Sequence, residues 1–456
     1  MSGLGPRALA ALWAGKLTKL FLKLMGRGGT TLPGRVARGV CPRLPACLAA
    51  GVDITAVSGT NGKTTTSRMI ESACEGAGID SFSNHSGANL ITGITTVLMD
   101  NADWLGRPRK THGVIECDEL TGRLAFPLLR PRRIVITNLY RDQLDRCGEI
   151  THVQNALRAG IGGAPEAELC LNADDPLICA LAGELPNAVH WFSVEGDFPG
   201  EGEGPNDARY CERCGAPYAY ERRSFAHLGA WYCPECGAAH PRAELLAELR
   251  QEGEESSEIT LRWEGESYPL TLPLPGSYHV YNAAAAATAL RSLGFTGTET
   301  AVALEHSSAA FGRGESFPLG GGVQMMLIKN PAGCDRVLHH LSTYAEPFTL
   351  AVLLNDETAD GTDISWIWDA DFERLGSLGM LQEILVGGKR GEELLLRMKY
   401  AGIDPRRVRL VHDLMELVSA LREREEKCVV MPTYTAMMAL RPLLVKETGG
   451  REFWEQ

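Results

Sequence analysis

The segment ITAVSGTNGKTTT at residues 54–66 constrains the fold of this chain more than any other. A run rich in apolar and β-branched residues ends in a turn with two glycines, and Lys63 and Thr64 follow directly. A strand, a glycine turn and a helix in this order aim backbone N–H groups, a lysine and a hydroxyl at phosphate oxygens and Mg²⁺. The common form of the motif has a glycine where Val57 stands, so this loop departs from it. We predict a phosphate-binding loop, and the alternative is a glycine-rich turn with a surface lysine.

Composition and charge limit the class of protein. The chain has 456 residues, 44% of them hydrophobic, and a formal net charge of −12, which fits a soluble protein of about three domains and argues against a nucleic-acid partner. Thirteen cysteines show no regular pairing over most of the chain, which is typical of a reducing, cytoplasmic setting without disulfides. We find no signal peptide and no apolar run of membrane-spanning length.

Residues 1–50 form a separate N-terminal region. Residues 8–25 predict an amphipathic helix with Lys16, Lys19 and Lys23, and a Gly/Pro loop follows at 26–34. We expect the apolar side of this helix to pack on the main body while its lysines face water. The alternative is peripheral contact with an anionic membrane at its inner face.

Residues 51–317 alternate apolar runs with helical stretches, which predicts a mostly parallel sheet with helices on both faces. Ligands of such sheets bind beyond the carboxyl ends of the strands. The polar residues expected there are Glu116, Asp118, Glu119, Asn138, Asp142, Asp145, Asn172, Asp174 and Asp175. Carboxylates near a triphosphate hold Mg²⁺, although each residue alone is also a common turn residue or helix N-cap. An acidic, helix-like segment at 243–258 is interpreted as a solvated face without function.

Four cysteines form the one organised group, with the spacing C-x₂-C-x₁₈-C-x₂-C and a glycine after each pair. They are Cys211, Cys214, Cys233 and Cys236. This spacing is typical of a zinc ribbon in which four thiolates surround Zn²⁺, with free thiols or an iron site as alternatives. A closed shell of four thiolates leaves no position for water, so we predict a structural zinc in an insertion at about 205–242.

Residues 318–456 repeat the strand and helix pattern and predict a second, smaller Rossmann-like α/β domain. One loop of this domain, residues 355–369, combines many acids with two tryptophans.

Five segments occur in the order found in Mur-type ligases: GTNGKTTT, the TN and D-x-x-D segment, LNADDP, PGSYHVYNAAAA and FGRGE. The chain therefore resembles this family, which implies ATP-dependent ligation through an acyl phosphate, with ATP and Mg²⁺ bound in a central P-loop domain. Glu116 would be the acidic partner of Mg²⁺, Asn282 would contact the adenine side, and Arg313 would bridge two domains at the phosphates. The implied nucleotide-site residues are Gly59, Thr60, Asn61, Gly62, Lys63, Thr64, Thr65, Glu116, Asn138 and Asn282.

Two departures distinguish this chain from typical Mur-type ligases. Gln143 stands where those enzymes usually carry a histidine, and no lysine occurs between Lys110 and Lys329 to form their carbamoylated lysine. A carbamate forms only on an amine, so the second metal arrangement of the family must be altered or absent.

The C-terminal loop and the four-cysteine insertion resemble the MurT family, and this resemblance covers nearly the whole chain. It implies ATP-dependent amidation of the α-carboxyl of D-glutamate in the lipid II stem peptide, giving D-isoglutamine, with ammonia from a GatD-type glutaminase in a heterodimer. One aspartate of the C-terminal domain would complete the partner's Cys-His-Asp site. Asp360 is the first choice, and Asp363 and Asp356 lie in the same loop.

Two other functions remain open from the sequence. The first is a stand-alone amino-acid ligase resembling folylpolyglutamate synthase, against which the missing lysine and the cysteine insertion argue. The second is a P-loop scaffold protein that binds ATP without making an amide.

Overall fold

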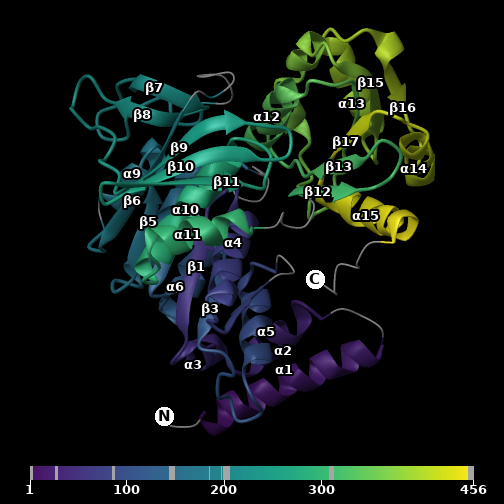
Figure 1. Cartoon of the computed structure of the whole chain (residues 1–456). Coiled ribbons are helices and arrows are strands. Elements are labelled where there is room, and N and C mark those ends of the chain that lie inside the picture. Colours follow the sequence, from purple (N-terminus) through teal and green to yellow (C-terminus); the bar gives the residue numbers. More distant parts are fainter. Residues whose placement is uncertain are drawn as a thin grey trace.

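The computed structural model describes residues 4–25, 29–84, 88–142, 149–183, 185–196, 198, 206–307 and 313–449. Two α/β domains follow one another along the chain, a large central domain and a smaller C-terminal domain (Figure 1). This confirms the predicted fold class.

A nine-stranded sheet organises the central domain, in the order β11-β10-β9-β6-β5-β4-β1-β3-β2. The strands from β2 to β9 run parallel, and β10 and β11 add an antiparallel edge. The bounds are β1 (Asp53–Ser58), β2 (Ser81–Ser83), β3 (His112–Glu116), β4 (Arg133–Ile136), β5 (Glu168–Asn172), β6 (Val189–Gly196), β9 (Leu245–Glu252), β10 (Ser257–Trp263) and β11 (Glu266–Leu272). The central strands are buried on both sides, which explains their continuous apolar sequences.

Helices cover both faces of this sheet, as the sequence predicts. One face packs against α4 (Lys63–Gly76), α10 (Tyr278–Ser292) and α11 (Gly297–Glu305). Five consecutive alanines of α10, residues 283–287, are fully buried, so this helix approaches the sheet closely. The other face packs against α5 (Ile91–Asn101), α6 (Glu119–Leu129), α8 (Ile150–Gly162) and α9 (Pro176–Ala182).

The prediction of a helix-like, solvated segment at 243–258 is wrong. This stretch forms β9 and the start of β10, and Leu245, Ala247 and Leu249 point into the core while their neighbours are more exposed. Its alanines, leucines and glutamates favour a helix locally. Pairing with β6 on one side and β10 on the other overrides that preference.

Three helices precede the central sheet: α1 (Pro6–Leu24), α2 (Leu32–Val40) and α3 (Leu44–Ala49). The predicted N-terminal helix exists, but the expectation that its apolar side packs on the body is wrong. Its buried residues are Ala8, Ala11, Leu12 and Gly15. Most of its large apolar side chains face outward.

A small hairpin of β7 (Ala219–Phe225) and β8 (Leu228–Tyr232) is inserted between β6 and β9, within the predicted range 205–242. It lies at the end of the central domain opposite α1 (Figure 1).

The C-terminal domain has a six-stranded sheet in the order β12-β13-β17-β14-β15-β16, parallel except for β12. Its strands are β12 (Arg313–Phe317), β13 (Val323–Met326), β14 (Phe348–Leu353), β15 (Leu381–Gly387), β16 (Val408–Leu410) and β17 (Lys427–Pro432). Helices α12 (Pro331–His340) and α13 (Gly391–Tyr400) pack on one face, and α14 (Leu414–Arg422) and α15 (Tyr434–Thr448) on the other. Because β12 joins this sheet, the sheet begins five residues before the predicted boundary at 318.

Among the described residues, the structure contains no helix that is both long and apolar enough to cross a bilayer.

Candidate nucleotide site between two domains

The predicted phosphate-binding loop connects β1 to α4. Gly59 and Gly62 have φ values of +119° and +88°, a left-handed region that favours glycine. A Cβ atom at Gly62 would lie 2.0 Å from Asn282 Oδ1, so only glycine fits between the loop and α10. Helix α4 begins at Lys63, and its N-terminal N–H groups are oriented to receive an anion.

Lys63 is held inside this loop. Its Nζ donates to the Gly59 carbonyl oxygen and lies 3.2 Å from Glu119 Oε2. Burial alone would lower the pKa of Lys63, but nearby carboxylates, first Glu119 and then Glu116, raise it. The raised pKa favours a charged ammonium group at the place where the motif predicts that terminal phosphates bind.

Thr64 and Glu116 form the pair expected for a Mg²⁺ site. The Thr64 hydroxyl donates to Glu116 Oε2 at 2.8 Å, and Asn89 Nδ2 donates to Oε1 of the same carboxylate at 3.1 Å. The end of β3 thus presents a buried carboxylate beside the first turn of α4. Hydroxyl and carboxylate oxygens are ligands that Mg²⁺ prefers, so these residues fit this ion.

Asn138 and Thr60 serve mainly to fix the loop. Asn138 Oδ1 accepts from the Asn61 backbone N–H at 2.9 Å, and its Nδ2 donates to the Asn61 carbonyl at 3.1 Å. The Thr60 hydroxyl bonds to both backbone groups of Tyr140. The segment that follows β4 therefore fixes the conformation of the loop.

The C-terminal domain supplies three residues that sequence reasoning did not assign to the site. Lys329 Nζ lies 2.6 Å from Asp142 Oδ2, and Asn330 Nδ2 donates to Asn61 Oδ1 at 3.2 Å. Arg336, on α12, donates to the Tyr140 hydroxyl at 2.9 Å. The position of Lys329 and Asn330 just after β13, at the carboxyl end of a parallel strand, is the signal that points to these two residues, whereas Arg336 lies within α12.

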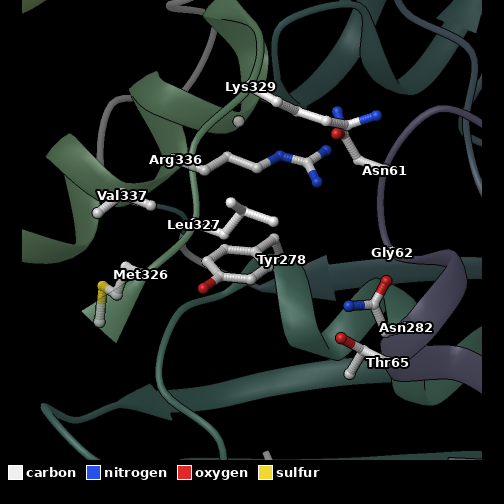
Figure 2. Close-up of a pocket in the computed structure, with 11 residues that line it drawn as sticks. Asn61, Gly62, Thr65, Tyr278, Asn282, Met326, Leu327, Lys329, Arg336 and Val337 are labelled. Atoms are coloured by element: carbon white, nitrogen blue, oxygen red, sulfur yellow. The ribbon is translucent and has the colours of Figure 1, made fainter. Parts of the chain in front are cut away.

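These residues line one cleft between the domains. Figure 2 shows Lys329 and Arg336 reaching toward Asn61 from the C-terminal side, with Asn282 and Thr65 beside Gly62 below. The Thr65 hydroxyl is buried without a hydrogen-bond partner in the structure. The cleft therefore presents two cations and unused polar groups to a ligand between the domains.

The C-terminal loop places its three aspartates in different surroundings. Asp360 is 5% exposed, and its carboxylate accepts from the Thr435 backbone N–H at 2.7 Å and from the Glu357 N–H at 3.2 Å. Asp356 pairs with Arg390 at 2.7 Å. Asp363 is exposed, and its Oδ1 accepts from the Ser365 N–H at 2.8 Å.

Tyr434 is the first residue of α15 and follows the end of β17. Burial raises the pKa of Tyr434, and the carboxylates of Glu116 and Asp360 raise it further. Both carboxylates act on one phenol, so it lies within electrostatic range of the loop and of the predicted Mg²⁺ pair.

The four insertion cysteines come together as predicted. Their sulfur atoms all lie within 4.8 Å of one another, with Cys211 Sγ 3.6 Å from Cys236 Sγ and Cys214 Sγ 3.4 Å from Cys233 Sγ. Zn–S bonds of about 2.3 Å in a tetrahedron separate sulfurs by roughly 3.8 Å, so the group fits zinc. Both halves use the same turn, in which the glycine after each pair has a positive φ and its N–H donates to the carbonyl of the first cysteine.

The tip of the insertion hairpin reaches the nucleotide cleft. The His227 ring stacks on Tyr140 with centroids 4.7 Å apart, and the Arg336 guanidinium lies 4.7 Å from the Phe225 ring centroid. At its base, His240 Nε2 lies 2.7 Å from the fully buried Asp174 Oδ1, which also accepts from Ser193. The cysteine group thus supports a hairpin that touches both domains.

Three predictions concern residues that the structure does not describe fully. The Arg313 side chain, Gln143 and Asp145 lie outside the described residues, and only the backbone of Arg313 is placed, opposite Met326. The chain has no lysine between Lys110 and Lys329, and Lys329 itself enters the cleft beside Asp142.

Comparisons with known proteins agree with this geometry. The Mur ligase middle domain matches residues 57–199, and the MurT ligase C-terminal domain matches residues 327–437. MurF from Acinetobacter baumannii aligns with 90% of this chain and 80% of its own, with a TM-score of 0.66 at 16% identity. Folylpolyglutamate synthase from Mycobacterium tuberculosis, complexed with ADP, aligns with 98% of this chain and 99% of its own, with a TM-score of 0.62 at 15% identity. Fold, family domains and site together define an ATP-dependent Mur-type ligase.

Closer relatives identify the family within this class. The MurT subunit of lipid II isoglutaminyl synthase (glutamine-hydrolyzing) from Streptococcus pneumoniae is 33% identical over 443 residues, covering 95% of this chain and 96% of the relative. The MurT subunit from Staphylococcus aureus is 32% identical over 446 residues, covering 97% and 99%. The chain belongs to the MurT family.

Proposed function

We propose that this chain is the ligase subunit of a lipid II isoglutaminyl synthase, which amidates the α-carboxyl of D-glutamate in the stem peptide to D-isoglutamine. The observation that carries the proposal is that Asp142, one of the carboxylates that raise the pKa of Lys63, also lies 2.6 Å from Lys329 Nζ of the C-terminal domain, in a chain of the MurT family. The named activity of the MurT relatives supplies the substrate class.

The proposed reaction has two steps. A carboxylate oxygen of the substrate attacks the γ-phosphorus of ATP, the bond to the β-phosphate oxygen breaks, and ADP leaves. Ammonia then attacks the acyl carbon, phosphate leaves, and the nitrogen loses a proton to give the amide. Lys63 and Lys329 offset the negative charge on the transferred phosphoryl group, and Arg313 is proposed to assist them. Mg²⁺ held by Thr64 and Glu116 would neutralise phosphate charge when bound.

The two domains together also exclude water from this cleft. An acyl phosphate hydrolyses readily, so the ligase needs a closed site during the second step. The contacts of Asn330 with Asn61 and of Arg336 with Tyr140 hold the domains together at the loop. Asn282 remains our proposal for the adenine side of the nucleotide.

The nitrogen is proposed to come from a GatD-type glutaminase that binds the C-terminal domain. One aspartate of this chain would complete the partner's Cys-His-Asp site by orienting its histidine. Asp360 was the first choice, but its carboxylate is buried and engaged by Thr435. The exposure of Asp363 favours that residue for direct contact, with Asp360 positioning the loop.

The four cysteines are proposed to hold a structural Zn²⁺. Their shell is complete with four sulfurs, so no position is left for water or substrate. The ion would stabilise the hairpin that contacts Tyr140 and Arg336.

The test is ADP release by the purified chain with lipid II and ammonium, and then with a GatD-type glutaminase and glutamine. Amidation lowers the mass of the lipid product by about one unit, since hydroxyl is exchanged for amine. Lys63→Ala should abolish release with both nitrogen sources, while Lys446→Ala, at an exposed lysine of α15, serves as the matched control. ATP turnover with unchanged lipid II under both nitrogen sources would exclude the proposal.

A stand-alone amino-acid ligase is the second candidate, because the chain aligns along nearly its full length with folylpolyglutamate synthase. It predicts ADP release with free glutamate and a soluble acceptor, without ammonium. A scaffold protein predicts ATP binding without any amide product.

A further inference from the structure

Most large hydrophobic side chains of helix α1 face outward, whereas a helix of a water-soluble domain normally buries them. The residues facing the protein are mainly small, namely Ala8, Ala11 and Gly15 together with Leu12. A Cβ atom at Gly15 would lie 2.5 Å from Met99 Sδ, so the helix sits close against α5. Large apolar side chains instead face outward, and the exposed fractions are 45% for Trp13, 57% for Leu17, 51% for Leu20, 62% for Phe21 and 79% for Leu24.

These outward residues form one continuous stripe. Positions 13, 17, 20 and 24 recur at the spacing of one helix face. A second exposed apolar pair, Trp104 and Leu105, adjoins the stripe, because Trp13 Nε1 donates to the Trp104 carbonyl at 2.8 Å. Lys16 Nζ lies 5.5 Å from the Trp104 ring centroid, which ties the same two elements together. We call this surface the α1 face: Trp13, Leu17, Leu20, Phe21, Leu24, Trp104 and Leu105.

The charge around the α1 face is the opposite of that of the whole protein. The first 52 residues contain eight Lys or Arg and no Asp or Glu, in a chain of formal net charge −12. By helical spacing Lys16 and Lys23 border the stripe, whereas Lys19, seven residues after the buried Leu12, lies on the side toward α5. Two acids lie nearby, Asp100 paired with Lys19 at 2.5 Å and Asp103 accepting from the N–H groups of its own turn.

We propose that the α1 face binds the surface of an anionic lipid bilayer, with helix α1 lying in the plane of the interface. An outward apolar stripe with tryptophans and bordering lysines is the pattern of a helix that inserts into the headgroup region. The basic border selects anionic over neutral lipid. A second copy of the chain fits less well, because two such basic borders would repel one another.

Figure 1 shows α1 along the outer edge of the central domain, packed on α2 and α5 and leaving its other side uncovered by the described helices and strands. The inference stands without the proposed reaction. Together with that reaction, it would keep the ligase at the membrane in which a lipid-linked substrate resides.

The experiment is sedimentation of the full chain with vesicles, in the absence of ATP and substrate. The chain should pellet with equimolar phosphatidylcholine and phosphatidylglycerol and stay in solution with phosphatidylcholine alone. Leu17→Ser with Leu24→Ser should lower the bound fraction at least about tenfold. Lys16→Gln with Lys23→Gln should lower it and weaken its salt dependence. Met415→Ser, at a 59% exposed residue of α14, is the matched control and should bind as wild type.

Three results would overturn the inference. They are wild-type protein that stays in solution with anionic vesicles, equal binding by the Leu17→Ser/Leu24→Ser variant, or a dimer in light scattering that this variant dissociates. A second assay separates this inference from the proposed function: ammonium-dependent ADP release with a water-soluble stem peptide, which needs no membrane. The rate of ADP release should be the same in the Leu17→Ser/Leu24→Ser variant as in wild type. If wild type releases no ADP, the proposed reaction is contradicted and the membrane inference is not.

Discussion

Lys329 Nζ of the C-terminal domain lies 2.6 Å from Asp142 Oδ2 of the central domain, so an ion pair joins the two domains beside the phosphate-binding loop. The other oxygen of Asp142 is buried and has no hydrogen-bond partner among the residues that the structure describes. This ion pair neutralises the Asp142 carboxylate and holds the Lys329 ammonium group near the predicted phosphate-binding loop.

Replacing Lys329 should therefore affect catalysis far more than stability. We expect Lys329→Ala to lower kcat/KM for ADP release about 10²-fold, because one preorganised positive charge is lost from the transition state. The melting temperature should change by no more than about 2 °C, since a partly exposed ion pair contributes little. Lys446→Ala should change neither quantity. A variant with normal kcat/KM would show that Lys329 only joins the domains.

The hydroxyl of Thr64 should determine the requirement for Mg²⁺. Thr64→Val removes the donor to Glu116 and one oxygen ligand, so we expect the Mg²⁺ concentration for half-maximal ADP release to rise at least about tenfold. Thr64→Ser keeps the hydroxyl and should behave nearly as wild type. Equal Mg²⁺ curves for the valine and serine variants would remove Thr64 from the ion's ligands.

Loss of zinc should weaken nucleotide binding at a distance. Cys214→Ser opens the sulfur shell, and the hairpin that brings Phe225 to Arg336 then loses its support. We expect a melting temperature lower by several degrees and weaker ATP binding in calorimetry. Cys47→Ser, at an exposed cysteine outside the group, is the control. Unchanged ATP affinity in a metal-free variant would show that the hairpin acts independently of the cleft.

Asp335 on α12 should make stability depend on pH. Burial raises its pKa from 3.8 to about 7. Between these values the unfolded carboxyl has lost its proton while the native one keeps it, so the free energy of unfolding falls as pH rises from 4 to 7. Asp335→Asn retains the oxygen that accepts from the Asp371 N–H but cannot ionise. The free energy of unfolding of this variant should therefore not fall between pH 4 and 7 on account of this position. We expect a gain on the order of 2 to 4 kcal/mol at pH 8 and almost none at pH 4, measured by urea unfolding.

An apolar patch at the end of the loop of residues 355–369 should bind the proposed glutaminase. Trp368 and Tyr400 are 48% and 70% exposed and pack edge to face with ring centroids 5.5 Å apart. Tyr400→Ala should weaken the heterodimer at least about tenfold and spare ammonium-dependent ADP release, because aromatic residues dominate interface energetics. Met415→Ser should leave the affinity unchanged. Heterodimer affinity equal to wild type in Tyr400→Ala would place the interface elsewhere.

The strands and the phosphate loop could be predicted because their signals are local. Glycines at 59 and 62 before Lys63, and a four-cysteine spacing, each require one backbone geometry. The contribution of Arg336 could not be predicted, because it depends on how one domain is placed on another. The nearest indication was the end of strand β13, which the sequence did reveal.

Two errors share one cause, the reliance on local pattern. The segment that forms β9 has helix-forming residues, and only its neighbours β6 and β10 determine that it is a strand. In α1 the amphipathic pattern was correct, but the side that meets the protein is the one with small residues. Which face of a helix is buried depends on what lies beside it, and the sequence of α1 alone does not contain that information.

The carboxylate of Asp360 joins the loop of residues 355–369 to the first turn of α15, the turn that also carries Tyr434. In the proposed complex, a glutaminase that binds this loop would therefore contact a segment that hydrogen bonds tie to α15. Binding of the partner would then constrain the start of α15 as well as the loop itself.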